Sequence, residues 1–317
     1  MLRVLVTGGT GYLGAAIVRA LAAHGHTPIV FARRATASDV PAIRVDGDVR
    51  DRRALTTAAQ DVDAVCHTAA LVSIWRPRPE EFDEVNVGGL KTVIDVCRTL
   101  KIPKLVYTSS FLARPPAGAT RPLSANDYQR TKAAAREVAR AAAEQGSPIV
   151  SLFPGVVYGP GASTEGNLVG RLIADHLAGK LPGIVGASLP WSFSYVDDVA
   201  GAHVAALERG NAGAEYVVGG ENAPQIRLFE LVRQVVGGRL PRQIPFGLAD
   251  AIAWVEEVRT RLSGRPPLLT RGAVEIFRHD WSLDSRDSVH SLGYRITPLE
   301  QGVRQTLAGM APWKGHG

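Results

Sequence analysis

The stretch Leu2-Arg3-Val4-Leu5-Val6-Thr7-Gly8-Gly9-Thr10-Gly11-Tyr12-Leu13-Gly14 decides how this chain folds. Its first half is an apolar run typical of a buried parallel strand, and residues 15–21 have the composition and period of a helix. The glycines between them have separate physical roles. Gly8 allows a tight turn, Gly11 lets the main chain approach a diphosphate, and Gly14 lets the helix pack close to the strand. The stretch predicts a phosphate-binding loop in front of a helix N-terminus that attracts an anion.

Length and composition limit the class of protein. The chain has 317 residues, of which 45% are hydrophobic and 21% charged, enough for a large α/β domain and a smaller lobe. No apolar run could span a membrane and no signal-peptide pattern precedes the first strand, so we expect a cytoplasmic protein without membrane contact. The net charge is +6, but no basic run is interleaved with aromatic residues, which argues against nucleic-acid binding.

The two cysteines, Cys66 and Cys97, fall in a predicted strand and a predicted helix. That placement favours reduced, packed thiols over a disulfide. No metal-ligand spacing occurs in the sequence, so we expect no metal site. His67 lies at a strand end without a carboxylate neighbour in sequence, and we interpret it as a structural histidine.

Strands and helices alternate after the glycine loop. We expect strands at 28–32, 43–49, 63–70 and 104–108, and helices from Asp51, over 80–100 and over 127–145. This alternation predicts an α/β fold, a doubly wound Rossmann parallel sheet with a smaller, mostly helical C-terminal lobe. The paired glycines Gly88 and Gly89 inside one helix predict close contact there with a cofactor or a neighbouring element.

The end of the second predicted strand indicates the cofactor. An NAD-preferring Rossmann site usually carries an acidic residue at this point, whereas arginine accommodates a 2′-phosphate. The chain has Arg33 and Arg34 there, and no Asp or Glu occurs between Thr10 and Asp39. We therefore predict NADP(H) over NAD(H), with both arginines as contacts.

Tyr128 and Lys132 carry the predicted chemistry. They lie four residues apart on a predicted helix, so they share one face, and an ammonium group beside a phenol lowers the phenol pKa. Ser110 follows a predicted strand, where its hydroxyl can bind the same substrate oxygen. Such a site polarises a carbonyl while a nicotinamide delivers hydride, or performs the reverse reaction on an alcohol.

The chain resembles the extended short-chain dehydrogenases/reductases along essentially its whole length. The segments that carry the resemblance are Thr7 to Gly14, Gly47-Asp48-Val49-Arg50-Asp51, His67-Thr68-Ala69-Ala70, Asn86-Val87-Gly88-Gly89, Tyr107-Thr108-Ser109-Ser110, Tyr128 to Lys132, Pro154 to Pro160 and Tyr195 to Ala200. The resemblance implies Ser110, Tyr128 and Lys132 as the catalytic residues, with Ser109 as the alternative serine and Asn86 in a proton relay. It also implies a homodimer that pairs through the helices at 80–100 and 127–145.

Cofactor contacts follow from the same resemblance. Asp48 and Val49 would flank the adenine, Ala69 and Ala70 the ribose, and Pro154 the nicotinamide. The complete set of expected cofactor contacts is Gly8, Thr10, Gly11, Tyr12, Leu13, Gly14, Arg33, Arg34, Asp48, Val49, Ala69, Ala70, Tyr128, Lys132, Pro154 and Val157.

Two branches of the family fit to different degrees. Nucleotide-sugar epimerases and dehydratases typically place an asparagine and an arginine where this chain has Val156 and Trp191. Losing that arginine removes charge-assisted contacts to a diphosphate. Together with Arg33, this favours a reductase of an apolar ketone or aldehyde, similar to the dihydroflavonol-4-reductase-like and 3β-hydroxysteroid-dehydrogenase-like members. The alternatives are an NAD-dependent epimerase/dehydratase, including the hopanoid-associated epimerase group, and a non-catalytic NADP sensor.

We divide the chain into an NADP-binding domain at 1–160, rejoined by 193–218, and a substrate lobe formed by 161–192 and 219–317. Phe193 to Val196 and Glu215 to Val218 are expected to return as strands to the main sheet. Trp191 and Phe111 are the expected substrate contacts, although aromatic residues in such lobes more often pack a core.

Overall fold

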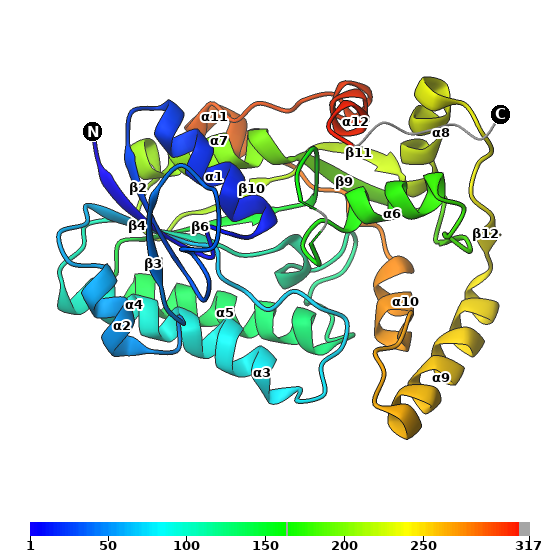
Figure 1. Cartoon of the computed structure of the whole chain (residues 1–317), viewed down its shortest axis with the longest axis horizontal. Coiled ribbons are helices and arrows are strands. Elements are labelled where there is room, and N and C mark those ends of the chain that lie inside the picture. The colour runs from blue at the N-terminus through cyan, green and yellow to red at the C-terminus, as the bar shows by residue number, and fades with distance from the viewer. Residues whose placement is uncertain (163, 311–317) are drawn as a thin grey trace.

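A seven-stranded parallel sheet forms the centre of the computed structural model, which describes residues 1–162 and 164–310 (Figure 1). Its strands run in the order β3, β2, β1, β4, β5, β6, β10, and every neighbouring pair is parallel. They are β1 (Arg3–Thr7), β2 (Thr27–Ala32), β3 (Ile43–Asp46), β4 (Ala64–His67), β5 (Leu105–Thr108), β6 (Ile149–Pro154) and β10 (Glu215–Val218). The order reverses at β1, as in a doubly wound dinucleotide-binding sheet, so the predicted fold class is confirmed.

Helices cover both faces of this sheet, one group above it and one below in Figure 1. Above lie α1 (Tyr12–Ala23), α7 (Val196–Arg209) and α11 (Arg286–Leu292). Below lie α2 (Arg52–Ala58), α3 (Glu80–Phe82), η1 (Asp83–Gly88), α4 (Gly89–Thr99) and α5 (Asp127–Glu144). Each group packs an apolar cluster against its face of the sheet, which explains the continuous apolar runs of the strands.

The paired glycines lie where the predicted helix at 80–100 changes its hydrogen-bond pattern. The π-helical turn η1 joins α3 to α4 there, and turns of this kind are frequent at functional sites. A side chain at Gly89 would press on Val49 Cγ2 at 2.9 Å, whereas one at Gly88 would meet nothing closer than 3.6 Å. The expected close contact therefore exists at Gly89, and its partner is the segment after β3.

The expectation that both returning strands rejoin the main sheet is half wrong. β10 does pair with β6, but β9 (Pro190–Tyr195) forms a separate three-stranded sheet with β7 (Val156–Tyr158) and β11 (Glu221–Pro224). The physical reason is aromatic burial: Trp191 and Phe193 of β9 pack into the apolar cluster of the C-terminal lobe.

Helices make up most of the rest of that lobe. They are α6 (Leu168–Leu177), α8 (Gln225–Val236), α9 (Phe246–Ser263), α10 (Arg271–Phe277) and α12 (Leu299–Ala308), together with the short parallel pair β8 (Ile184–Val185) and β12 (Gln243–Ile244). The short helix η2 (Phe111–Ala113) instead follows β5. The sequence predicts helical segments at 167–179, 228–236 and 248–262, and these correspond to α6, α8 and α9. The division into domains remains a prediction, and residues 163 and 311–317 of the predicted lobe lie outside the described residues.

The outer surfaces of α4 and α5 bear on the expected dimer. Thirteen large apolar side chains are exposed in the described part of the chain, and none of them lies on these two helices. Pairing through α4 and α5 therefore remains a prediction.

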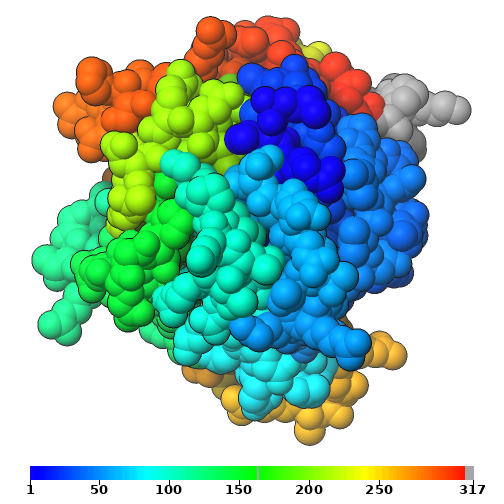
Figure 2. Space-filling model, turned by 90° about the vertical axis from the view of Figure 1, so that its left-hand side faces the viewer, coloured from blue at the N-terminus to red at the C-terminus, as the bar shows by residue number. Residues whose placement is uncertain are grey.

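Figure 2 views the molecule from the left of Figure 1. In this view α4 and α5 end in cyan and green, and the gold residues of α9 protrude at the lower edge.

Candidate active site

The glycine loop has the geometry that an anion site requires. Gly8 has a φ of +72°, and a side chain there would come within 2.7 Å of the Ala69 main chain. A side chain at Gly14 would overlap the Gly8 carbonyl, so helix α1 is in contact with the loop. Gly11 caps α1 without a side-chain hydrogen bond, and no acidic residue occupies the first turn. A diphosphate therefore fits here, because the first N–H groups of α1 are open to an anion.

The side chain of Tyr12 anchors the glycine loop. Its ring is buried, and its hydroxyl donates a 3.0 Å hydrogen bond to the Gly159 carbonyl. The ring also lies against Gly161. This side chain ties the loop to the segment after β7, which leaves only the main chain of Tyr12 to meet a cofactor. Thr10 is exposed and Leu13 is partly buried beside it.

The carboxyl end of β2 carries two exposed arginines. Arg33 and Arg34 make no ion pair among the described residues. Asp48, near Arg33, accepts hydrogen bonds from the Arg50 guanidinium at 2.8 and 3.0 Å. These bonds, with a smaller attraction from Arg33, hold the pKa of Asp48 below its usual range. The Asp48 carboxylate is thus already engaged, while both arginines of the β2 end are available to an anionic ligand.

Small residues line the ends of β4 and the turn after β3. Ala69 and Ala70 are partly exposed beyond the end of β4, and Val49 is buried against Gly89. Pro154 ends β6 and is buried, and Val157 in β7 is partly exposed. All of these positions follow the carboxyl ends of parallel strands, where a doubly wound sheet binds its ligand.

Asn86 fixes the loop after β4. Its side-chain oxygen accepts a hydrogen bond from the Leu71 N–H at 2.7 Å, and its amide nitrogen donates to the Leu71 carbonyl and to Thr131 Oγ1. Asn86 is buried, and these bonds connect the π turn η1, the loop and α5. The proton relay implied for Asn86 by the resemblance gains no support here, since these bonds give it a positioning role.

Lys132 is a buried ammonium group. Its Nζ donates to the Thr108 carbonyl at 3.0 Å and lies 5.3 Å from the centre of the Tyr107 ring. The side chain has no carboxylate partner in the described part of the chain, and burial lowers its pKa to about 8. The Thr108 hydroxyl is bonded in turn to His203 Nε2 at 2.7 Å.

Tyr128 and Ser110 lie side by side. Ser110 Oγ accepts a 3.2 Å hydrogen bond from the Leu112 N–H and thereby caps η2. Burial raises the pKa of Tyr128 to about 12 and outweighs the lowering by the nearby Ser110 hydroxyl. The expected lowering of this pKa by Lys132 is therefore wrong for the protein without ligands, because burial dominates and Nζ is directed to Thr108. Ser109 Oγ is buried and has no hydrogen-bond partner among the described residues.

His67 is buried at the end of β4 and is 2.7 Å from Thr7 Oγ1 through its Nδ1. Its ring stacks on Tyr107, with ring centres 5.8 Å apart. Burial lowers the pKa of His67 to about 3, with a further contribution from Lys132, so the ring is neutral at physiological pH. A buried neutral ring bonded to a threonine fits the structural interpretation of this residue. Cys66 and Cys97 are free and buried, and burial raises the pKa of each thiol to about 12.

Trp191 and Phe111 lie in the aromatic core of the lobe. Trp191 is only 4% exposed and stacks on Phe277, with ring centres 5.2 Å apart. Phe111 packs edge-on against Trp281. A void of about 10 Å³ beside Trp191 holds at most one water molecule. Both aromatic residues therefore shape the wall behind Tyr128, with which they share one apolar cluster.

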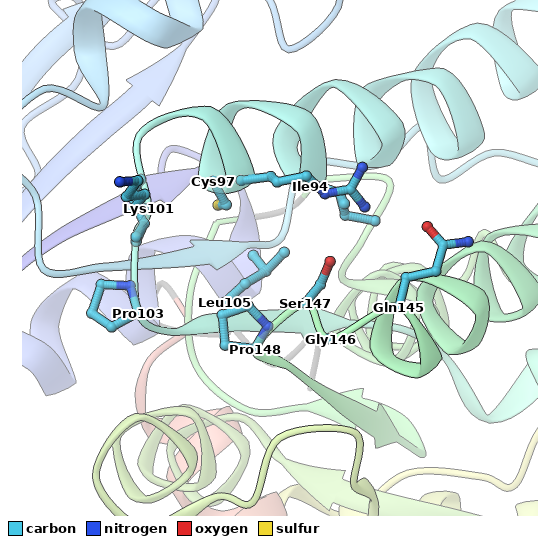
Figure 3. Close-up of a pocket in the computed structure, with 11 residues that line it drawn as sticks. Ile94, Cys97, Lys101, Pro103, Leu105, Gln145, Gly146, Ser147 and Pro148 are labelled. Carbon is cyan, nitrogen blue, oxygen red and sulfur yellow. The ribbon is translucent and has the colours of Figure 1, made fainter.

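A separate cleft lies away from this site (Figure 3). It measures about 390 Å³, and its walls include Cys97 and Lys101 at the end of α4 and Gln145 and Pro148 after α5. Leu105, the first residue of β5, also lines it, so the cleft is at the amino edge of the sheet. Tyr128 and the glycine loop lie at the carboxyl edge, which separates the cleft from the predicted chemistry.

The described residues contain no group of three or more His, Cys, Asp and Glu side chains that could hold a metal ion. A search of the described helices for one long and apolar enough to cross a membrane is likewise negative.

Comparison with known proteins agrees with the geometry. Residues 4–219 match the family model described as "NAD dependent epimerase/dehydratase family". The chain belongs to this family. Its members bind a nicotinamide cofactor, and the proteins similar to this chain include both reductases and epimerases. The resemblance to the extended short-chain dehydrogenases/reductases is confirmed.

Several relatives match this family member over nearly its full length. Sterol demethylase protein B of Methylococcus capsulatus is 32% identical, over 96% of this chain and 97% of its own. The 2-alkyl-3-oxoalkanoate reductase of Stenotrophomonas maltophilia is 31% identical, over 98% of this chain and 100% of its own. The crystal structure of gox2253 is similar with a TM-score of 0.81 and 29% identity, over 98% of both chains. The UDP-glucose 4-epimerase of Thermus thermophilus, solved with NAD, has a TM-score of 0.76 and 25% identity, over 97% of this chain and 98% of its own.

Sequence reasoning missed two residues that hold the site of this family member together. Thr131 bonds Asn86 from α5, and Thr108 holds both Lys132 and His203. His203 was the available signal, because it stands in the apolar middle of helix α7, where a buried histidine needs a polar partner.

Proposed function

We propose that this chain is an NADP(H)-dependent oxidoreductase that transfers hydride between the nicotinamide and a ketone, aldehyde or secondary alcohol of a fairly apolar small molecule. The observation that carries the proposal is that the Ser110 hydroxyl after β5 lies near the Tyr128 phenol, on a helix that also carries the buried Lys132. Two hydroxyl groups that converge on one point, with a cation on the same helix face, can bind and protonate a carbonyl oxygen. Relatives named 2-alkyl-3-oxoalkanoate reductase and putative dihydroflavonol 4-reductase support the choice of a carbonyl substrate.

Tyr128 is the acid in the direction of reduction. It donates its phenolic proton to the carbonyl oxygen, and that oxygen accepts a second hydrogen bond from Ser110. Because the pKa of Tyr128 is about 12, the proton is present throughout the neutral range. Without ligands Lys132 Nζ is bonded to the Thr108 carbonyl, so we propose that it stabilises the remaining phenolate only when cofactor and substrate occupy the site. The nicotinamide, when bound, supplies the hydride that reaches the carbonyl carbon.

The preference for NADP(H) rests on the end of β2. Arg33 and Arg34 are exposed there without ion pairs among the described residues, and a guanidinium binds a phosphate in bidentate geometry. Asp48 follows β3, not β2, and its carboxylate is bonded to Arg50. It therefore does not replace the acidic residue that an NAD site carries at the end of β2 to bind the ribose 2′-hydroxyl.

The test is NADPH oxidation, followed by absorbance, with aryl ketones, dihydroflavonols, 3-ketosteroids and aldehydes, and with NADH in parallel. We expect turnover with at least one carbonyl and NADPH, and little with NADH. Tyr128→Phe is the matched control, because it keeps the ring and removes only the hydroxyl. Turnover that survives this substitution contradicts the assigned role of Tyr128.

A second candidate is an NAD-dependent epimerase, favoured by the likeness to the Thermus thermophilus epimerase. Val156 and Trp191 argue against it, because neither side chain can bind a diphosphate as an asparagine and an arginine would. No NADPH oxidation with any of the carbonyls, together with tightly bound NAD in the purified protein, would favour the epimerase. A protein that binds NADPH but turns over neither carbonyls nor nucleotide sugars would be the non-catalytic sensor.

A further inference from the structure

Helix α9 turns an apolar face to solvent. Leu248 is 54% exposed, Val255 55% and Leu262 85%, and Ile252 also belongs to the exposed set. Their spacing of four, three and seven residues puts them on one side of the helix. Trp254, 57% exposed, lies beside this side. We call these five residues the α9 face. A continuous exposed apolar surface of this kind marks a site of interaction.

The opposite side of α9 explains why the apolar side is outside. Ala249, Ala253 and Thr260 are buried, and the two alanines pack on Val185 and Val274 in a small separate cluster. Small side chains draw the helix close to the lobe and leave its larger apolar residues no room on that side. Figure 1 shows α9 running down and away from the main body, with α10 on its inner side.

Charge around the α9 face is basic. From Arg239 to Arg278 the sequence has seven arginines and four acidic residues. Each of the four acids is in an ion pair: Asp250 with Arg278, Glu256 with Arg259, Glu257 with Arg271, and Glu275 with Arg278 and His279.

The remaining arginines are Arg239, Arg242, Arg261 and Arg265, and none has a carboxylate partner within 1–162 and 164–310. Arg239 and Arg242 precede α9, and Arg261 and Arg265 stand at its far end. The apolar face therefore lies between two pairs of unneutralised arginines.

We propose that the α9 face binds the surface of an anionic lipid bilayer. Apolar side chains would enter the boundary between headgroups and acyl chains, and the flanking arginines would contact lipid phosphates. Trp254 has the amphipathic ring that is enriched at such interfaces. A second copy of this chain fits less well, because stacking two α9 faces would bring like-charged arginines together. Surface binding needs no spanning helix, so the proposal is compatible with the missing apolar runs but contrary to the expectation of no membrane contact.

The test is flotation of the full-length protein with vesicles of phosphatidylcholine alone or with phosphatidylglycerol added. We expect flotation with the anionic vesicles, little with the neutral ones, and release at high salt, where charge attraction is screened. The substitutions Ile252→Asn and Val255→Asn together should reduce the bound fraction roughly tenfold. Val235→Asn and Val289→Asn together are the matched control, because both residues are exposed apolar residues on other helices.

A charge variant tests the arginines separately. Arg261→Gln with Arg265→Gln should weaken flotation with anionic vesicles, whereas Arg53→Gln with Arg121→Gln, also exposed and without ion pairs among the described residues, should leave it unchanged. Thermal unfolding reports whether each variant is folded. No flotation with either vesicle, equal flotation of both charge variants, or self-association that the Ile252 and Val255 substitutions abolish would each overturn the proposal. Flotation does not depend on turnover, so its outcome tests membrane binding independently of the proposed reaction.

Discussion

The carboxyl edge of the main sheet and the C-terminal lobe differ in the kind of side chain that they bury. At the sheet edge several buried polar groups bond one another: Thr108 bonds His203 and Lys132, and Asn86 bonds Thr131, although the Ser109 hydroxyl has no partner among the described residues. In the lobe, the centre is an aromatic cluster around Trp191, whose indole nitrogen is buried without a hydrogen-bond partner among the described residues.

The difference separates chemistry from specificity. A polar network fixes each member, because leaving one buried partner unbonded costs about 1–3 kcal/mol. Apolar contacts are non-directional, so a lobe built from them can change its wall with little effect on the reacting groups. The comparison teaches that substitutions at the sheet edge should change the reaction, and those in the lobe should mostly change stability or substrate choice.

The largest expected effect is at Tyr128. Replacing it by phenylalanine removes the proton donor and keeps the ring in its apolar cluster. We expect kcat to fall roughly 10²–10⁴-fold, the range contributed by a positioned acid. Steady-state kinetics with NADPH and any active carbonyl measure it, and NADPH affinity is the control for folding. A loss below tenfold would mean that the sheet edge does not hold the acid.

Acid should weaken the sheet edge next most strongly, through His203. Burial lowers the pKa of His203 to about 4 from its usual 6.5. Between these two pH values the histidine is protonated in the unfolded chain and neutral in the folded chain. Stability is therefore full above pH 6.5 and falls by about 3 kcal/mol from this residue as the pH drops to 4. Urea unfolding across this range should show a shallower pH dependence for His203→Asn. The exposed His290→Asn should follow the unmodified protein, and equal slopes for all three would contradict the argument.

The sheet edge was also the part that the sequence could predict. Gly8, Tyr128 and Lys132 have local causes: a turn that needs positive φ, and two side chains one helical turn apart. The structure agrees with the predicted strand order of a doubly wound sheet because βα alternation has few solutions. What failed there was the pKa of Tyr128, since burial depends on residues far away in sequence.

The lobe was less predictable for a related reason. The strand β9 has the composition of a main-sheet strand, and only its partners β7 and β11 show that it builds a second sheet. Likewise, α9 has apolar residues with helical periodicity, which normally indicates a buried face. Its alanine side is buried instead, and nothing local in the sequence states which side meets the lobe.

The arginines at the end of β2 allow a smaller but sharper test of the sheet edge. Arg33→Ala should weaken NADPH binding about 10–100-fold, because one charge-assisted contact to the 2′-phosphate is lost. NADH lacks that phosphate, so its affinity should stay within about twofold. Binding measured by fluorescence for both cofactors gives the ratio. Equal losses for NADPH and NADH would show that Arg33 acts on the fold or on the shared diphosphate.

Trp191→Phe should have the smallest effect, and it tests the lobe directly. Phenylalanine keeps an aromatic ring against Phe277 and removes the unpartnered indole N–H, so the cost is lost packing area of about 1–2 kcal/mol in unfolding free energy. Because Trp191 is buried and the void beside it holds at most one water, kcat/KM should change by less than about threefold. Thermal unfolding and steady-state kinetics of the same preparation separate the two effects. A large rise in KM with unchanged stability would instead place the Trp191 nitrogen against the substrate, and the lobe would then contribute a directional contact as the sheet edge does.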